Sequence, residues 1–570
     1  MMTQRYRHGT SSRDQGSALI VVLGTTMVLI ILATVAATAA MSTNRVARHS
    51  GDWNQALAAA EAGVDDYLAR LNKNDLYWRT ATDCSNLAMQ RPNVSSCSWG
   101  ADKPVGWVPV PGADRAEYHY EAETTSTPVN GTVRLTSTGR VGEVTRSVQT
   151  VLRRGGFGEF LYYTMYEEVD PANTSTYDGA SGRRTTTWAA ANCVRYWWPT
   201  TSPRNSDCVN IQFAGGDVIN GPMHTNDRIL TGGAVRFKGT TTTSWPDCDK
   251  PTGKQCYAKA GSTANPIFEK GISYRPEIEL PTTVGDLRPY VDATKTEEPG
   301  CLYTGPTRIK LVATTAAYST MQVWSPYSQT ALNTGCGNAT EFKDRPTVAQ
   351  TLTIPHNRLI IVRDIPAGGP TPQTNSNGSC KAATISSFPQ TDDWNETLPD
   401  ANCRYGTLYV EGTLKGRMTL VADNNIIITD HLKYHGGKTG TEALGLIAGN
   451  SVKVYHPVKR SSSGTFSDMD RPESKGKFQN AVVQASILTL MHSFNVQAWD
   501  KGSTSGLGTL SLFGSFAQRY RGPVATTSGT GYDKNYEYDT RLRFAPPPYF
   551  LDPVRSAWGI KAYGEVAAAY

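Results

Sequence analysis

The longest apolar run of the chain lies near its N-terminus and passes into a one-sided helical pattern. Residues 17–44 contain no charged side chain, and a helix needs about 20 apolar residues to cross the hydrocarbon core of a bilayer. Farther along, apolar residues recur at spacings of three and four, which predicts an amphipathic helix. Because no proline separates the two patterns, one continuous helix is expected over 17–72. The predicted apolar stripe of its second half comprises Trp53, Leu57, Ala60, Val64, Tyr67, Leu68 and Leu71.

Short alternating runs follow the helix and predict a small antiparallel β domain over 73–155. Asn130 and Gly131 form a typical hairpin-turn pair, and Gly139 and Gly142 bracket a second predicted turn. We expect this sheet to cover the apolar stripe of the helix. The alternating runs occupy 117–122, 132–136 and 146–152.

Residues 156–570 carry many short period-two runs and no long amphipathic pattern. Turn residues between the runs fit either a β-sandwich or a stacked solenoid. Small residues and asparagines within the rows favour the solenoid, because they can stack in ladders at the corners of a parallel β-helix. The expected fold class is therefore α+β and then mainly β: a long helix, a small antiparallel meander, and a large β-solenoid-like extracellular domain with disulfide-stapled insertions. The clearest runs lie in 408–428, 444–454, 483–491 and 510–516.

The composition indicates an exported protein. Charged residues make up 19% of the chain, and glycine and tyrosine are plentiful, which is typical of β-rich extracellular domains. The net charge of +6 is too small to indicate a nucleic-acid binder by itself.

All ten cysteines follow the apolar run, and their even number predicts disulfides in an oxidising compartment. No Cys-x-x-Cys pair occurs, so neither a zinc site nor a redox motif is expected. Sequence leaves the connectivity open, and pairing of neighbours is the simplest arrangement. The pairs would be Cys84–Cys97, Cys193–Cys208, Cys248–Cys256, Cys301–Cys336 and Cys380–Cys403.

Three interpretations of the N-terminus compete. A secretory signal would be cleaved near Ala37-Thr38-Ala39, but its apolar run is usually only about 7–15 residues long. A plain uncleaved membrane anchor would also fit the length. The third interpretation is a prepilin-type signal: a short basic leader, residues 1–16, that ends in Gly16 directly before the apolar helix.

The order of leader, Gly16, apolar run and the later segment 55–63 (QALAAAEAG) resembles the N-terminal region of PilX-type minor pilins of type IV pili. The resemblance implies that a prepilin peptidase cuts between Gly16 and Ser17. It also implies that the helix holds the protein in the cell membrane and then packs against other pilins in an extracellular pilus on the cell surface. The residues expected to serve this helix are Leu19, Val21, Leu29, Leu32, Trp53, Leu57, Val64 and Leu68.

One departure from the family concerns the fifth position after the expected cleavage site. Most major pilins have a glutamate there, which is thought to pair with the N-terminus of a neighbouring subunit, whereas this chain has Val21. A subunit without this carboxylate fits best at the tip, where no subunit lies ahead of it. The large domain after residue 156 favours the same position and predicts a minor pilin that primes assembly and presents a β-rich binding or adhesion module.

Catalysis is not expected, although β-helix folds host enzymes that act on polysaccharides. A glycosidase needs two converging carboxyl groups, and Asp423, Asp430, Asp468 and Asp470 are the acidic candidates near the predicted rows. Turn formation explains these residues equally well. A membrane-anchored polysaccharide enzyme and a surface adhesin outside any pilus remain the alternatives.

No metal or cofactor is expected either. His224 with Asp227, and His431 with His435, lack a third ligand nearby, and Asp423-Asn424-Asn425 lacks the spacing of a calcium loop. Basic residues and tyrosines near 433–460 and 519–543 could form a nucleic-acid or glycan surface, or a solvated face. The candidate ligands of the β domain are therefore a glycan, a host surface or DNA.

Overall fold

The computed structural model describes residues 15–570, apart from 75–76, 128–130, 179–183, 199–203, 263, 376–378, 382–384, 399–400, 527 and 555–556. The chain forms two compact units. The first unit contains the described part of Met1–Glu123 together with Val133–Leu152 and Ile560–Tyr570. The second unit contains Thr124–Thr132 and Arg153–Gly559. The leader, residues 1–14, and the turn residue Asn130 lie outside the described residues.

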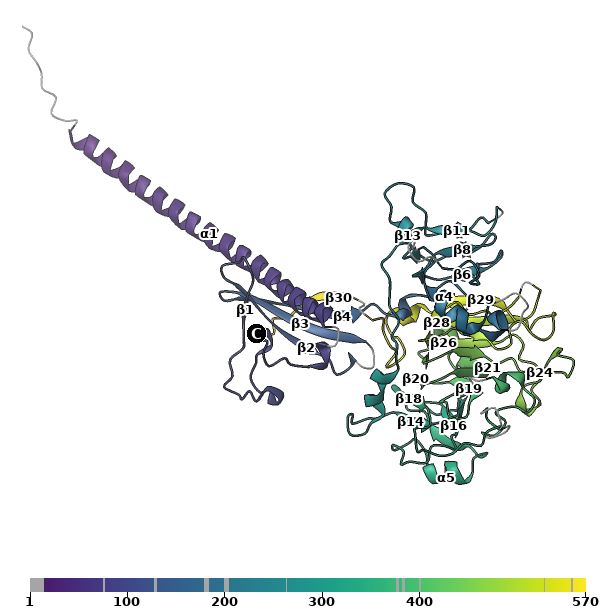
Figure 1. The fold of residues 1–570 in the computed structure, drawn as a ribbon. Coiled ribbons are helices and arrows are strands. Elements are labelled where there is room, and N and C mark those ends of the chain that lie inside the picture. The colour runs from purple at the N-terminus through teal and green to yellow at the C-terminus, as the bar shows by residue number, and fades with distance from the viewer. Residues whose placement is uncertain are drawn as a thin grey trace, which may run out of the picture. The chain divides into compact units, whose positions relative to one another are not determined.

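The first unit is built on one long helix, α1 (Gln15–Lys73), which is the extended purple helix in Figure 1. The predicted single helix over 17–72 is confirmed, and the helix already includes Gly16 and Ser17. Within the described part of the chain, α1 is the one helix long and apolar enough to cross a membrane, and none of its apolar window is buried. Length and composition therefore fit a membrane-spanning segment.

The buried face of α1 is rotated relative to the predicted stripe. The stripe residues Ala60, Val64, Tyr67 and Leu71 are buried as predicted, but Ala56 and Ala59 are buried too, and Trp53, placed in the stripe by the sequence, is 45% exposed. Leu57 and Leu68 are only half-buried. The prediction weighted large apolar residues, whereas close packing against a sheet favours small ones. The buried residues of the helix are Ala56, Ala59, Ala60, Gly63, Val64, Tyr67 and Leu71.

The sheet of the first unit has the strand order β1-β2-β3-β4-β30. Strand β2 pairs antiparallel with β1 and β3, as the predicted meander requires. The C-terminal strand β30 was expected in the second domain, 156–570, but it extends the first unit's sheet. Alternation along a strand does not encode which sheet the strand will join. The strands are β1 (Val108–Pro109), β2 (Ala116–Glu123), β3 (Thr132–Val141), β4 (Val144–Arg154) and β30 (Trp558–Val566).

Gly139 lies within β3 and does not form part of a turn, contrary to the prediction. A Cβ atom at Gly139 would lie 2.1 Å from the backbone oxygen of Ala56 and 2.3 Å from the backbone nitrogen of Ala60. The helix backbone therefore crosses the sheet directly above this glycine. Gly142, with a φ of +60°, occupies the predicted turn between β3 and β4.

The second unit is mainly β. Among its described residues, 21 strands form one sheet, most of whose pairings are parallel; β15, β16 and β17 form an antiparallel excursion. Two further pairs, β8 with β11 and β24 with β25, lie apart from it. Its α-helices are short: α3 (Thr174–Tyr177), α4 (Thr186–Asn192) and α5 (Ala339–Asp344). The strands are β5 (Tyr162–Tyr166), β6 (Val218–Asn220), β7 (Met223–Thr225), β8 (Ile229–Thr231), β9 (Arg236–Phe237), β10 (Thr241–Thr243), β11 (Tyr257–Lys259), β12 (Ile267–Phe268), β13 (Ile272–Tyr274), β14 (Cys301–Thr304), β15 (Thr307–Val312), β16 (Thr320–Trp324), β17 (Gln350–Thr353), β18 (Arg358–Arg363), β19 (Leu408–Leu414), β20 (Arg417–Ala422), β21 (Ile426–Tyr434), β22 (Ala443–Ala448), β23 (Val452–Val454), β24 (Val458–Arg460), β25 (Phe466–Asp468), β26 (Val482–Thr489), β27 (Phe494–Val496), β28 (Thr509–Tyr520) and β29 (Asp533–Tyr538).

The chain enters this stack of strands in its middle. Strand β5 pairs in parallel with β7 on one side and with β28 on the other. From β7 the parallel pairings continue through β10 to β13. From β28 they run back through β26, β22, β20 and β18 to β14. In Figure 1, β13 and β14 accordingly lie toward opposite ends of the second unit.

Buried side chains align from strand to strand in the second unit. One row passes through eight paired positions, and every member is buried. Such a row places apolar side chains in register along the stack, which buries them without any single large helix. The row consists of Cys301, Ile360, Leu420, Leu446, Ile487, Phe516, Tyr162 and Met223.

Asparagines form a hydrogen-bonded ladder where the chain turns between strands. The side-chain amide of Asn450 donates to Oδ1 of Asn424, whose own amide donates to Thr407 Oγ1 at 2.9 Å. Asn425 accepts from the backbone N–H of Ser451 at 3.1 Å. These hydrogen bonds satisfy backbone and side-chain groups that the turns would otherwise leave unpaired.

The ten cysteines form five disulfides between neighbours in the sequence, and no cysteine is free. Each pair closes a short segment, with separations between 8 and 35 residues. One bridge lies in the first unit and four lie in the second. The pairs are Cys84–Cys97, Cys193–Cys208, Cys248–Cys256, Cys301–Cys336 and Cys380–Cys403.

Candidate functional site

The first candidate surface is the uncovered half of α1. Leu19, Val21, Leu29 and Leu32 are exposed, with Val21 at 62% and Leu29 at 63%. The threonine hydroxyls of this half return to the helix backbone: Thr25 Oγ1, for example, donates to Val21 O at 2.8 Å. Such bonds leave no hydroxyl in need of water, so the surface suits lipid or neighbouring apolar helices. Thr26, Thr34, Thr38 and Thr43 make equivalent bonds.

The covered half of α1 is held to the sheet by a polar network as well as by small residues. Asp66 forms an ion pair with Arg70, one turn along the helix, at 2.8 Å. It also accepts a 2.6 Å hydrogen bond from the hydroxyl of Tyr120 in β2. Asn86 donates to the same hydroxyl at 2.7 Å, which ties in the loop of the Cys84–Cys97 disulfide. Helix, sheet and loop are therefore linked through one buried tyrosine.

The C-terminal strand adds further contacts within the first unit. Tyr563 donates to Oε1 of Glu61 on α1 at 2.8 Å, and Arg146 of β4 pairs with Glu565 at 2.6 Å. The ring of Tyr570 packs edge-on against His119, with ring centroids 4.8 Å apart. The chain thus returns to the helix and its sheet after forming the whole second unit.

Three of the four acidic residues considered for catalysis are occupied in ion pairs. Asp423 accepts from Arg288 and from the backbone N–H of Asp364. Asp430 pairs with Arg471 and Lys475. Asp468 contacts His456 and Lys477, and these hydrogen bonds hold the pKa of its carboxyl well below the usual range. Asp470, the fourth candidate, is exposed in the segment between β25 and β26. The turn and ion-pair interpretation of these residues therefore fits the geometry.

The histidines considered as metal ligands are likewise engaged. His224 Nδ1 lies 2.8 Å from Thr242 Oγ1 and Nε2 lies 2.9 Å from Asn226 Oδ1, and burial lowers the pKa of the imidazole to about 3. Asp227 forms an ion pair with Arg204. His431 Nδ1 accepts from the backbone N–H of Val482, whereas His435 is exposed. These contacts account for His224, Asp227 and His431.

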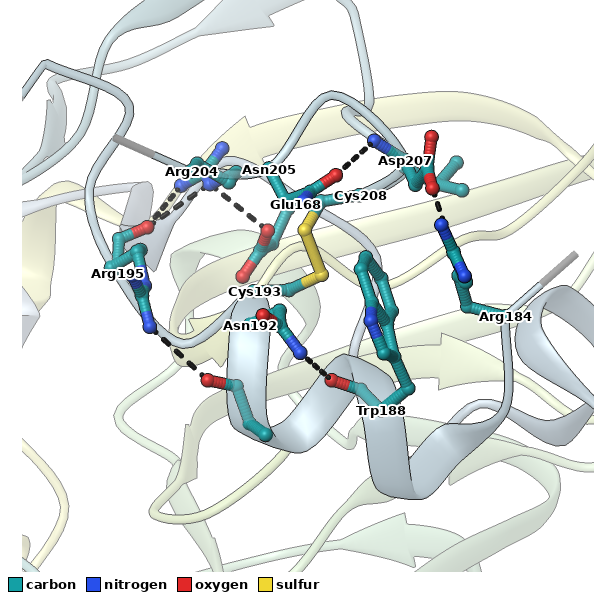
Figure 2. The surroundings of a disulfide bond; sticks show 12 residues. Glu168, Arg184, Trp188, Asn192, Cys193, Arg195, Arg204, Asn205, Asp207 and Cys208 are labelled. Carbon is teal, nitrogen blue, oxygen red and sulfur yellow. Dashed lines mark hydrogen bonds and ion pairs between the residues drawn. A yellow bond between two sulfur atoms is a disulfide. The ribbon is translucent and has the colours of Figure 1, made fainter. Parts of the chain in front are cut away.

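One described group has three potential ligand atoms within 4.8 Å of one another: Glu168, Cys193 and Cys208. Figure 2 shows that the two sulfur atoms are joined to each other, so they are not thiolates available to a cation. Arg204 Nε lies 3.0 Å from Glu168 Oε2, next to the disulfide. Burial, strengthened by Asp227 and Asp170, nevertheless raises the pKa of Glu168 to about 9. The cluster is a buried charged network of the second unit.

The tyrosines and one arginine of the basic and aromatic set near the C-terminus are buried, whereas Lys433, Arg460 and Arg543 are exposed. Arg521 is buried and pairs with Glu167 at 3.2 Å, with its guanidinium over the ring of Phe213. Tyr520, Tyr536 and Tyr538 are buried. Period-two spacing placed these residues on strands, but it did not show that the tyrosines lie inside. Lys438, Lys459 and Arg541 form ion pairs with Glu537, Asp392 and Asp539.

The second candidate surface is a groove of about 370 Å³ on the outer face of the second unit. Its floor follows one row of paired residues across β19, β21, β23 and β27. Residues 170, 172–175, 394, 395, 398 and 401 also line it, together with residues 497–499 directly after β27, which brings Trp394 and Trp499 to the groove. Its size falls in the usual range of ligand sites. The floor residues are Tyr409, Ile427, Lys453 and Asn495.

Sequence reasoning did not identify this groove as a site. The signal was weak, because only Lys453 and Asn495 of the floor are polar and half-buried, whereas Tyr409 and Ile427 are buried like their neighbours Val410 and Ile428. The segments that line its sides come from positions more than 200 residues apart along the chain, for example Asp170 and Trp394. Only the folded stack brings them together.

No family model matches the chain, and no curated protein matches its sequence. Among solved structures, the crystal structure of the competence-associated pilin ComZ from Thermus thermophilus is similar to this chain at 12% sequence identity. The alignment covers 90% of this chain and 97% of that one, with a TM-score of 0.21. A TM-score of this size does not establish a shared global fold.

Proposed function

We propose that this protein is a minor pilin of a type IV pilus or a related filament. The observation that carries the proposal is the division of α1, whose first half is apolar and exposed while its second half packs on an antiparallel sheet. Exposed apolar area is unfavourable in water by about 25 cal/mol per Å², so this half needs lipid before assembly and neighbouring helices afterwards. Other pilins and the membrane are the partners that this surface fits.

The first test is the N-terminus of the mature protein. We infer that a prepilin peptidase cuts between Gly16 and Ser17, which removes the basic leader and leaves the apolar helix on the protein. Intact-mass analysis of protein purified from its native membrane or filaments should give a chain that begins at Ser17. A chain that begins at Met1 or Ala40 would contradict the pilin assignment.

We further propose that the subunit lies at the filament tip. Val21 supplies no carboxylate to the subunit ahead of it, and an unpaired charge within an apolar bundle costs several kcal/mol in order of magnitude. The second unit, Arg153–Gly559, is also large for a tightly packed shaft. Gold labelling of the second unit on isolated filaments should mark one end, and even labelling along the shafts would exclude the tip.

We infer that the second unit is a parallel β-helix that serves as an outward binding or adhesion module and has no catalytic activity. The aligned parallel pairings and the asparagine ladder support the β-helix. The ion pairs of Asp423, Asp430 and Asp468 support a binding role over polysaccharide cleavage. Incubation of the full chain with polysaccharides should release no new reducing ends. Cleavage that is lost in Asp423→Ala or Asp468→Ala would favour the enzyme.

A further inference from the structure

We propose that the groove across β19, β21, β23 and β27 binds a neutral oligosaccharide. This proposal deepens the binding role proposed for the second unit and rests on it. The groove belongs entirely to that unit, and its floor repeats from strand to strand. Because paired strands lie about 4.8 Å apart, four of them provide a floor about 14 Å long. A floor of that length suits a linear oligosaccharide of several sugar residues.

The polar groups that line the groove are mostly amides and hydroxyls. Asn450 lies in the turn between β22 and β23, Asn495 lies in β27, and both side chains are half-buried. Gln497 directly follows β27. Thr186 and Ser451 add hydroxyls. Amides and hydroxyls both donate and accept hydrogen bonds, which matches the hydroxyl groups of a sugar. A ligand that only donates or only accepts hydrogen bonds would engage fewer of these groups.

Indole rings complete the groove. Trp394 and Trp499 both line it and both are half-buried, so part of each side chain faces solvent. Trp394 is held by an edge-on contact with Phe466 at a centroid distance of 5.1 Å. A flat apolar face beside hydrogen-bonding groups fits the weakly apolar face of a pyranose ring.

The charges that line the groove distinguish a glycan from DNA. Among the described residues that line the groove, Lys453 is the one lysine and none is an arginine. The carboxylate of Asp170 also lines the groove, where it contacts His492 Nδ1 at 2.8 Å. A nucleic acid is held chiefly by several cations placed against its phosphates. The groove offers too few cations for that, and the same balance favours a neutral sugar over an acidic one.

The test is isothermal calorimetry with the full chain in detergent micelles. The probes are the neutral hexasaccharides of β-1,4-linked N-acetylglucosamine, β-1,4-linked glucose and α-1,4-linked glucose, with hexagalacturonate and a twelve-residue thymidine oligonucleotide beside them. At least one neutral hexasaccharide should bind saturably, and more tightly than either anion. Trp394→Ala should raise its Kd at least tenfold, and Asn495→Ala about fivefold. The control Lys433→Ala, an exposed residue of β21 outside the groove, should leave Kd within twofold.

Each outcome decides the proposal. Failure of all three neutral probes to bind, or binding that Asn495→Ala leaves unchanged, would overturn it. Stronger binding of the oligonucleotide or hexagalacturonate would overturn it in favour of an anion site. If Trp394→Ala does not fold, Asn495→Ala alone carries the test. Because the measurement does not require filaments, a Ser17 start with no sugar binding would refute the groove alone, and sugar binding without filament assembly would refute the pilin assignment alone.

Discussion

The two units differ in how far they bury their apolar side chains. In the first unit, Leu29 on α1 is 63% exposed, and the neighbouring apolar residues of the helix are exposed too. In the second unit, Leu420 and its partners along the row from Cys301 to Met223 are buried by the strands of the same chain. A chain that can bury long apolar rows in one unit leaves a long apolar surface uncovered in the other. An uncovered apolar surface of this kind is typical of a binding surface, which agrees with the contacts to lipid or other helices proposed for it.

The means of close packing differ as well. In the first unit a helix meets a sheet through small residues, and Gly63 and Gly139 allow the two backbones to approach. In the second unit, in-register strands bury large side chains in rows, and asparagines and disulfides hold the turns. One unit therefore depends on a few contacts that tolerate no added atom, and the other on many repeated ones.

The largest effect is expected from Gly139→Val. The new side chain would meet backbone atoms of Ala56 and Ala60, which cannot rotate away. The free energy of unfolding of the first unit should therefore fall by more than about 3 kcal/mol. Hydrogen exchange on the full chain should show that β2, β3 and the second half of α1 lose protection, while the second unit keeps it.

The control for this change is Gly564→Val in the same sheet. No heavy atom lies within 4 Å of a Cβ at that position. Equal loss of protection in the two variants would show that Gly139 does not hold helix and sheet together.

Removal of one disulfide should destabilise one unit only. The Cys193–Cys208 bridge closes a separation of 15 residues, so replacement of both cysteines by alanine should cost about 3 kcal/mol. The matched pair Cys84→Ala and Cys97→Ala, with a separation of 13, should cost a similar amount in the first unit. Hydrogen exchange resolved by unit distinguishes the two results.

Non-reducing peptide mapping of the unmodified chain should give all five neighbouring pairs. Crossed bridges would contradict the structure.

Deletion of 560–570 should destabilise the first unit by about 2 kcal/mol, because hydrogen bonds and ring contacts to Glu61, Arg146 and His119 are lost. Protection of β4 against hydrogen exchange should fall. Tyr563→Phe, which removes only the bond to Glu61, should cost less than about 1 kcal/mol. An unchanged β4 in the deletion variant would mean that β30 is not needed to complete the sheet.

The last predicted effect is on the pH dependence of the second unit. The pKa of Glu168 is about 9 in the folded chain, against an ordinary value of 4.5. Between these values the folded chain keeps a proton that the unfolded chain releases, so the free energy of unfolding falls as pH rises. The low pKa of His224 has the opposite effect, but only between about 3 and 6.5.

Thermal unfolding from pH 7 to 9 tests this effect above the range in which His224 acts. Burial also raises the pKa of Glu167, so the contribution of Glu168 is taken from the difference between the unmodified chain and its variant. The melting temperature should fall across this range, and Glu168→Gln should make the fall shallower. The exposed control Glu279→Gln should not change the slope. A slope that is the same in all three proteins would show that Glu168 is ionised in the folded chain.

Local pattern alone determined much of this protein. An uncharged run followed by spacings of three and four produces one helix, because hydrogen bonding within a helix depends only on nearby residues. Alternation likewise predicted strands, and the short loops between neighbouring cysteines agree with the bridges observed. The position of Asn424 and Asn450 within the alternating rows also suggested that asparagines would stack, and the two side chains are hydrogen-bonded to each other.

Only the tertiary structure decided which surfaces meet. A strand's alternation does not specify its partner, so nothing local indicated that β30 would join the first unit or that β5 would enter the middle of the stack, beside β28. Nor could spacing show that Ala56, rather than Trp53, would face the sheet, because that choice depends on the backbone approach at Gly139. The groove, too, required segments from 170 to 499 to converge. Such long-range contacts depend on how whole elements fit together, which no short stretch of sequence encodes.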